Sequence, residues 1–310
     1  MAKSKLVLAA MTMTAGLTLL AASVAQTAQA APGSAPAGAA APAAPVFLAA
    51  ELRGSNEVPA ADPDGRAVAV VRIQGSQVSF ALAWRNISAP VAAHIHIGAA
   101  GVNGPVRVGF FAGALPATLT AVTGTVTVAD PAVTAAIVAN PAGFYANIHT
   151  ADFPGGAVRG QLHVLKHPVD LLQFLRVGSL VAVETGDQEV AGGDLDGHAV
   201  AFVRASGGTV RFGVSFAGIA PPSAGHIHQG AVGVAGPVVV GFFAGALPAS
   251  INGIAGTVTG VAPALVRDIN RNPSGFYANL HNADFPAGAV RGQLFRASVH
   301  TVNADDLIAD

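Results

Sequence analysis

The stretch at residues 93–117, AHIHIGAAGVNGPVRVGFFAGALPA, returns at residues 225–249 as GHIHQGAVGVAGPVVVGFFAGALPA. A second stretch, NPAGFYANIHTADFPGGAVRGQL at residues 140–162, returns at residues 272–294 as NPSGFYANLHNADFPAGAVRGQL. Both repeats have the same offset of 132 residues, so no loop between them has gained or lost net length. Because solenoid repeats have periods of only about 20–50 residues, we interpret the two copies as two whole domains.

Each copy has the pattern of an antiparallel β protein. Residues 74–77, Gln-Gly-Ser-Gln, separate two apolar β-type runs and are typical of a hairpin turn. Asp130-Pro131 predicts the start of one short helix, which Asn140-Pro141 ends. Ala262 stands where the first copy has Asp130, so the second helix lacks that cap. The pattern predicts an all-β fold of two antiparallel Greek-key β-sandwich or barrel domains, each with one short helix.

The beginning of the chain has the features of an export signal. Lys3 and Lys5 precede an apolar stretch, and Ala28-Gln29-Ala30 forms a small-x-small cleavage site, so we expect cleavage after Ala30. The expected segments are a signal peptide (1–30), a disordered Ala/Pro linker (31–45), domain 1 (46–165), a linker (166–177), domain 2 (178–298) and an acidic tail (299–310). We therefore expect a secreted or extracytoplasmic protein with no membrane span after signal cleavage.

Composition excludes several classes of function. The formal net charge of −1 gives no basic surface for nucleic acid or for an anionic membrane. The sequence contains no cysteine, which excludes disulfides, thiolate metal sites and cysteine nucleophiles. No nucleophile elbow or dinucleotide-binding motif is present, so we assign no catalytic residue and do not expect an enzyme.

Histidines gather on predicted strands at a spacing of two residues. His94 and His96 project from one face of a strand because alternate side chains share a face. In the later segments, Asn147 and His149 share a face, as do Arg159 and Gln161. The corresponding residues of the second copy are His226, His228, Asn279, His281, Arg291 and Gln293. If these strands are neighbours, each domain brings three imidazoles, an amide pair and a guanidinium together.

Two interpretations of this cluster stay open. Three neutral imidazoles at a sheet surface form a common ligand set for copper or zinc, which makes His94, His96, His149, His226, His228 and His281 candidate metal ligands. In the other interpretation the same residues hydrogen-bond the glycine-rich loop that follows His96, or grip a ligand. Asn147, Arg159, Gln161, Asn279, Arg291 and Gln293 are the candidates for such supporting or ligand-gripping roles.

The quoted motifs resemble the CHRD domain, the module first described in chordin and also found in exported bacterial proteins. The resemblance rests on His-x-His-x-Gly followed by Gly-Pro, and on Tyr-x-Asn-x-His followed by Arg-Gly-Gln, and it covers nearly all of both copies. It implies an extracellular domain. The chain is also similar, more faintly, to the sandwich of copper/zinc superoxide dismutase, which implies copper ligation by the three histidines of each copy. The sequence has no counterpart of the bridging histidine, the zinc loop or the cysteines of that family.

These observations lead to two hypotheses about function. The first is a non-enzymatic extracellular binding module that recognises an unidentified protein or small ligand through loops at one end of the sandwich. The second is a copper-binding protein, with redox activity similar to superoxide dismutase as an option, that uses one three-histidine site in each domain.

Overall fold

The computed structural model describes residues 44–298, which lie in one compact unit of the chain. The predicted signal peptide at residues 1–30, the linker as far as residue 43 and the tail at residues 299–310 lie outside the described residues. In the described part, no helix has both the length and the apolar character needed to cross a bilayer.

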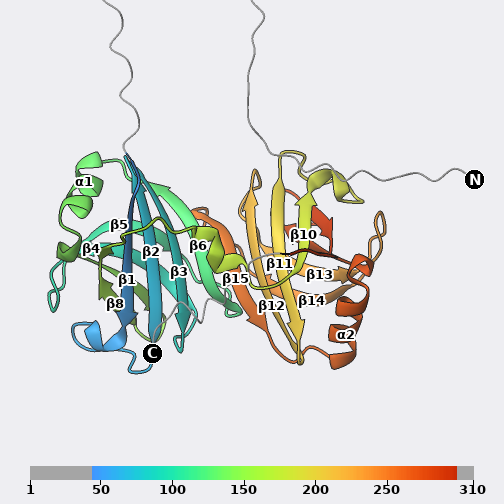
Figure 1. The fold of residues 1–310 in the computed structure, drawn as a ribbon, viewed down its shortest axis with the longest axis horizontal. Helices are drawn as coiled ribbons and strands as arrows, with labels where there is room; N and C mark the ends of the chain where they lie inside the picture. Colours follow the sequence, from blue (N-terminus) through green and yellow to red (C-terminus); the bar gives the residue numbers. More distant parts are fainter. Residues whose placement is uncertain (1–43, 299–310) are drawn as a thin grey trace, which may run out of the picture. The chain divides into compact units, whose positions relative to one another are not determined.

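Each copy of the repeat folds into nine strands, one α-helix and short 3-10 helices (Figure 1). The first copy contains β1 (Val46–Arg53), η1 (Gly54–Asn56), β2 (Arg66–Gln74), β3 (Gln77–Arg85), β4 (Pro90–Ile97), β5 (Val106–Ala112), β6 (Leu119–Thr127), α1 (Pro131–Ala139), η2 (Pro141–Gly143), β7 (Phe144–Thr150), β8 (Val158–Gln161) and β9 (His163–Val164). The linker contains η3 (Leu171–Leu175). The second copy contains β10 (Leu180–Thr185), η4 (Gly186–Gln188), β11 (His198–Ser206), β12 (Thr209–Ala217), β13 (Ala224–Gln229), β14 (Val238–Ala244), β15 (Ile251–Val258), α2 (Pro263–Arg271), η5 (Pro273–Gly275), β16 (Phe276–His281), β17 (Val290–Gln293) and β18 (Phe295–Arg296).

The strands of each copy form two antiparallel layers, which are joined along one edge because the first strand also pairs with the last two. In the first copy, β1, β2, β3 and β6 pair in that order, and β5, β4, β7 and β8 form the second sheet in that order. The chain crosses between the sheets after β3, after β5 and after β6, as in a Greek key. The second copy repeats these pairings. The predicted all-β fold of two antiparallel Greek-key sandwich domains is therefore confirmed.

The core of each domain lies between its two sheets and is filled from alternate strand positions. The ring of Phe80 in β3 stacks on the ring of Phe110 in β5, with centroids 4.6 Å apart. Phe212 and Phe242 form the same pair in the second domain, at 4.5 Å. Gly124 in β6 leaves room for this packing, because a Cβ there would lie 2.4 Å from the Phe80 ring. Since alternate residues face opposite ways, the outer face of the second sheet stays free for polar side chains.

The two α-helices begin differently, as the sequence predicts. The Asp130 carboxylate accepts a hydrogen bond from the backbone N–H of Ala132 at 2.9 Å, whereas Ala262 offers no side-chain cap to α2. Both helices nevertheless span nine residues. Each starts with a proline and buries one isoleucine, Ile137 or Ile269, in the core, so packing compensates for the missing cap.

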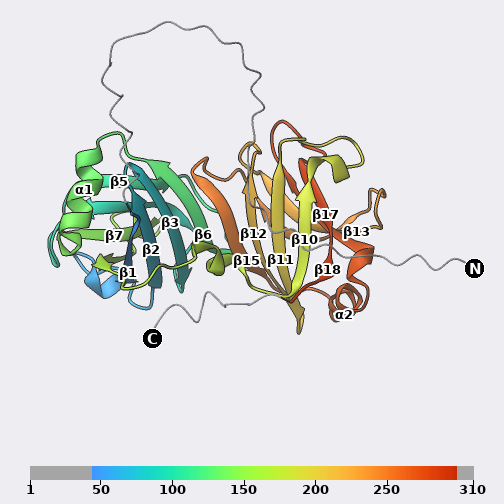
Figure 2. The same cartoon turned by 45° about the horizontal axis from the view of Figure 1, so that its top comes forward.

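The two domains share one continuous sheet. β6 of the first domain pairs antiparallel with β15 of the second, and the two strands lie side by side in Figure 2. The Thr118 hydroxyl donates a hydrogen bond to the backbone carbonyl of Phe242 at 2.7 Å. The Thr123 hydroxyl donates another to the Asn252 side-chain oxygen at 3.0 Å. Because β6 and β15 pair with each other, neither strand leaves an unprotected sheet edge at the joint.

The linker covers the outer face of this shared sheet. Phe174 and Leu175 of η3 are fully buried in an apolar cluster with residues of both domains. Gly213 and Gly253 make this possible, because a Cβ on Gly213 would lie 1.9 Å from the Leu175 carbonyl oxygen and one on Gly253 would lie 2.5 Å from its side chain. The equivalent positions of the first copy are Ala81 and Ala121, whose small side chains pack in the same cluster.

A buried glutamate distinguishes the second core from the first. Glu184 of β10 is 1% exposed and stands where the first copy has the buried Leu52. Neither of its carboxyl oxygens has a hydrogen-bond partner among residues 44–298. Burial, and to a smaller extent the neighbouring charge of Glu189, raises the pKa of the Glu184 carboxyl well above its ordinary value of 4.5. The folded domain therefore favours the protonated acid.

Truncating the buried ring of the linker should destabilise the protein. Phe174→Ala should lower the free energy of unfolding by about 3–5 kcal/mol, because it empties a fully packed position. Leu172→Ala is the matched control in the same helix, since Leu172 is 44% exposed, and it should change the value by at most about 0.5 kcal/mol. Chemical denaturation measures both, and equal losses would contradict the packing of η3 on the shared sheet.

Replacing the buried acid by the residue of the first copy should stabilise the second domain. An unfolded glutamate ionises above its ordinary pKa of 4.5, whereas the folded state keeps the Glu184 proton, so the wild-type fold loses stability as pH rises from 4.5. Glu184→Leu removes this loss. The difference in unfolding free energy between variant and wild type, measured by denaturation from pH 4 upward, should grow with pH. A difference that is independent of pH would contradict the burial of an ionisable acid.

Candidate metal centre

Strand pairing in the second sheet brings the three histidines of each domain together. His94 and His96 lie on the outer face of β4, while Ile95 between them is fully buried in the core. β4 pairs with β7 in a register that places Ala92 opposite His149 and His94 opposite Asn147. His149 therefore projects from the same outer face, as the two-residue period of a strand predicts.

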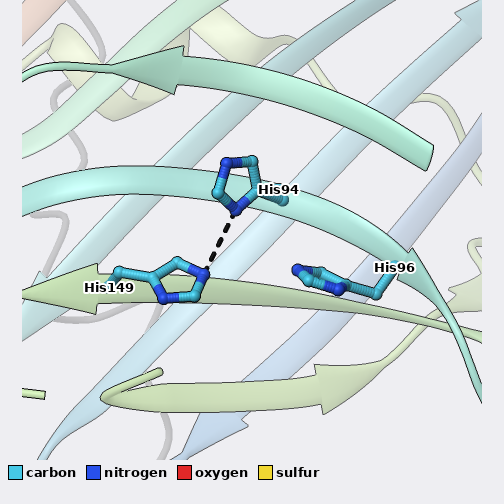
Figure 3. A group of neighbouring side chains, drawn as sticks. All are labelled: His94, His96 and His149. Atoms are coloured by element: carbon cyan, nitrogen blue, oxygen red, sulfur yellow. Dashed lines mark hydrogen bonds between the residues drawn. The ribbon is translucent and has the colours of Figure 1, made fainter. Parts of the chain in front are cut away.

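The ring nitrogens of these histidines converge on one point. His94 Nδ1 lies 3.2 Å from His149 Nε2, and the two rings point toward each other with His96 beside them (Figure 3). One nitrogen from each of the three rings lies within 4.8 Å of the other two. The same distance limit holds for His226, His228 and His281 in the second domain. Both triads are therefore compact enough for one ion to touch all three rings.

Backbone carbonyls determine which nitrogen of two rings is free. The Nδ1–H of His96 donates to the Gly104 carbonyl at 2.8 Å, and the Nδ1–H of His149 donates to the Pro154 carbonyl at 3.0 Å. The equivalent distances in the second domain are 2.8 Å from His228 to Gly236 and 3.0 Å from His281 to Pro286. Because a carbonyl only accepts, the proton must sit on Nδ1 in each case, which leaves a lone pair on Nε2.

The remaining ring nitrogens differ between the two domains, because His94 Nδ1 and His149 Nε2 are within hydrogen-bond distance of each other in the first. His96 Nε2 in the first domain has no hydrogen-bond partner among the described residues. In the second domain the atoms without a partner are His226 Nδ1, His228 Nε2 and His281 Nε2. A buried acceptor without a partner is costly, so three of them facing one point need a donor or a cation. The donor set fits a metal ion, with His94 or His226 ligating through Nδ1 and the other two rings through Nε2.

Burial keeps these rings in the neutral, ligating form. Desolvation, followed by the charges of His149 and His96, lowers the pKa of His94 from 6.5 to about 4. The same causes, with His281 and His228 as the neighbours, lower the pKa of His226 to about 4. Desolvation also lowers the pKa of His149 and of His281. Lone pairs therefore stay available for a metal at neutral pH.

A stack of planar groups supports one histidine of each triad. The ring of Tyr145 lies parallel to that of His96, with centroids 4.9 Å apart, and the Arg159 guanidinium lies 4.0 Å from the centre of the Tyr145 ring. The Tyr145 oxygen accepts a hydrogen bond from the backbone N–H of Gly104, whose carbonyl holds His96. The second domain repeats the stack with His228, Tyr277 and Arg291. These two are the only tyrosines of the chain.

The other predicted site residues hold the surrounding loops. Arg159 donates to the Asn103 side-chain oxygen at 2.8 Å and to the Val102 carbonyl at 3.1 Å, and Gln161 donates to the Gly98 carbonyl at 3.0 Å. In the second domain Arg291 donates to the carbonyls of Ala231 and Val234, and Gln293 donates to that of Gly230. Asn147 lies between the histidines and Arg159, with its side-chain oxygen buried and without a partner, as does Asn279. The guanidinium is thus engaged by the loop after β4.

Sequence reasoning missed one pair of site residues and two pairs of carbonyl groups. Glu57 is buried and Glu189 is half-buried, and their only signal in the sequence is that both recur at the repeat offset. The carbonyls of Gly104 and Pro154 left no sequence signal, because any residue has a carbonyl and only the loop geometry aims it.

The comparison with protein families agrees with the repeat. The family model described as the CHRD domain matches residues 48–162 and again residues 180–294, which together make up more than half of the chain. No curated protein matches the sequence.

The lowered pKa values give a test in the metal-free protein. His94 and His226 should titrate near pH 4 in an NMR titration of the imidazoles. An unfolded imidazole takes up its proton near its ordinary pKa of 6.5, so the stability of the metal-free fold should fall as pH drops from 6.5 toward 4. A midpoint near 6.5 for both rings would show that they are solvated and not packed as described.

Proposed function

Because the chain belongs to the CHRD domain family, we propose that it is an exported protein whose two CHRD domains each bind one transition-metal ion through three histidines. The observation that carries the proposal is the convergence of three ring nitrogens in each triad. Of these nitrogens, His96 Nε2 in the first domain and all three in the second domain are buried without a hydrogen-bond partner. Export is supported by the signal-like segment at residues 1–30 and by the absence of cysteine, which removes any dependence on disulfide formation.

Copper is the ion that the donor set favours. Three neutral imidazole nitrogens suit both copper and zinc, and for a given nitrogen site the divalent ions bind in an order that peaks at copper. A carboxylate or thiolate is absent from both triads, which disfavours magnesium and calcium because those ions prefer oxygen ligands. Three protein ligands leave a coordination position open for an exogenous molecule.

A second candidate function is recognition of an extracellular partner by the loops next to the centres. The loop after β4 exposes Val102 and the start of β5 exposes Val106, at 53% and 47%. Val234 and Val238 are exposed at the equivalent positions of the second domain, at 52% and 51%. Exposed apolar side chains that recur in both domains support a docking surface. This surface and the metal centre are compatible, since they use different residues.

Metal stoichiometry tests the proposal directly. Untagged protein that is equilibrated with Cu(II) and then desalted should retain two copper ions per chain by elemental analysis. His96→Ala should retain one and His96→Ala/His228→Ala should retain none, because removing one of three ligands cripples a site. His163→Ala is the control, since His163 is exposed and outside both triads, and it should retain two.

Other results would contradict metal binding. Wild-type protein that retains no copper and no zinc, with His96→Ala affecting only the melting temperature, would leave the histidines with a structural role. The partner-binding function would then be the better account. Copper that survives the double variant would place the bound ions at other residues.

A further inference from the structure

We propose that Glu57 and Glu189 are positioning residues of the two metal centres. Each glutamate supports the turn whose carbonyl group accepts a hydrogen bond from the third histidine of its domain, His149 or His281. The glutamate would therefore influence the metal through the backbone of this turn, without touching the ion. This inference rests on the metal-binding function proposed above. It names residues that determine the metal affinity of each centre.

Glu57 is a buried acid whose carboxyl group interacts electrostatically with the Arg159 guanidinium. It follows η1, is 7% exposed, and its Oε1 has no hydrogen-bond partner within residues 44–298. Its backbone N–H donates to the Gly54 carbonyl at 3.1 Å, which fixes the start of the side chain. A buried acid is costly in a fold, and a glutamate recurs at the equivalent position of the second domain, where Glu189 is half-buried. This recurrence indicates a role other than core packing.

The carboxyl group of Glu57 lies against the turn that follows β7. A Cβ built on Gly156 would lie 2.5 Å from Glu57 Oε1 and 2.8 Å from its carboxyl carbon, so a larger residue there would displace the carboxyl group. Gly156 also has a φ of +132°, which glycine adopts without strain. In the second domain Gly288 has a φ of +143°, and a Cβ there would lie 2.3 Å from Glu189 Oε1.

That turn carries the carbonyl group that holds the third histidine. Pro154, two residues before Gly156, accepts the hydrogen bond from His149 Nδ1 at 3.0 Å. Within the turn, the N–H of Gly156 donates to the Phe153 carbonyl at 3.1 Å. A displacement of Gly156 therefore moves the segment that includes the Pro154 carbonyl. In the second domain Pro286 holds His281 in the same way, and Asn279 donates to Glu189 Oε1 at 3.5 Å.

Fixing this hydrogen bond matters for metal affinity. The bond keeps the proton of His149 on Nδ1 and the ring turned so that Nε2 faces the other two imidazoles. Loss of an outer hydrogen bond to a metal-ligating histidine lowers metal affinity by about 10–100-fold. Loss of a contact that acts only on the turn should therefore change the metal affinity and the tautomer of His149, while His96 keeps its bond to the Gly104 carbonyl.

Comparison of the two domains singles out the contacting residues. The segment GSNEVPAA at residues 54–61 corresponds to GDQEVAGG at residues 186–193, and the glutamate survives while most of its neighbours differ. In the turn, Gly156 corresponds to Gly288, whereas the preceding Gly155 corresponds to Ala287. A Cβ on Gly155 would meet nothing within 4 Å. Gly155→Ala is thus a suitable control, because the second domain naturally has alanine at this position.

The experiment uses the full chain in a His228→Ala background, which leaves only the first centre. Cu(II) is titrated against a competing chelator, and the tautomer of His149 is read from imidazole nitrogen shifts in the metal-free protein. Glu57→Ala and Gly156→Ala should each weaken copper binding by about 10–100-fold and should lose the pure Nδ1–H form of His149. Glu57→Gln, which keeps the contact and removes the charge, should restore both, and Gly155→Ala should resemble the parent.

The outcomes separate this inference from the proposed function. If the parent binds no copper, metal binding is wrong, and the tautomer of His149 in the Glu57→Ala protein still tests whether the glutamate supports the turn. If Glu57→Ala and Gly156→Ala lower only the melting temperature, with the copper affinity and the tautomer unchanged, the glutamate is merely structural and the inference is wrong. If Glu57→Ala does not fold, Glu189→Ala in a His96→Ala background asks the same question at the second centre, with His281 as the histidine whose tautomer is read.

Discussion

Hydrogen bonds from imidazole Nδ1–H groups to backbone carbonyls are the constraint on which the site depends. In four of the six histidines these bonds place the proton on Nδ1. In the first domain the lone pairs on Nε2 of His96 and His149 then point toward His94. Each accepting carbonyl belongs to a loop held by buried polar side chains: Arg159 holds the loop after β4, and the Glu57 carboxyl lies against the turn after β7. The sandwich provides a rigid sheet, and the loops on its outer face aim the nitrogens.

The comparison of the two domains separates what the site needs from what the fold tolerates. The triads and the tyrosine stacks agree to within 0.1 Å in their ring-centroid distances, 5.6 and 5.0 Å among the histidines and 4.9 against 4.8 Å for the stack. Elsewhere the domains differ for identifiable reasons. Gly213 and Gly253 replace alanines where the linker packs, and Glu184 replaces Leu52 in the core. Drift in the cores beside near-identical centres favours a function located on the outer face.

The sequence alone predicted which side chains share a face of a strand, but it did not predict the contacts between distant segments. The spacing of His94 and His96 was enough to place both rings on one face, with Ile95 in the core, because strand geometry is local. Convergence with His149 required β4 and β7 to be neighbours in one register, which the sequence suggested only through polar faces of similar pattern. The pairing of β6 with β15 was beyond prediction, since it depends on contacts between segments far apart in the sequence. The buried Glu57 and the aimed carbonyl of Pro154 were invisible for the same reason.

The most direct test of the account is anomalous diffraction at the copper absorption edge from crystals of the full chain grown with Cu(II). The account predicts one anomalous peak in each domain, at bonding distance, about 2.0 Å, from His94 Nδ1, His96 Nε2 and His149 Nε2 and from their counterparts in the second domain. Peaks located at exposed histidines such as His163, with both triads free of metal and their rings still hydrogen-bonded to the same carbonyls, would contradict it.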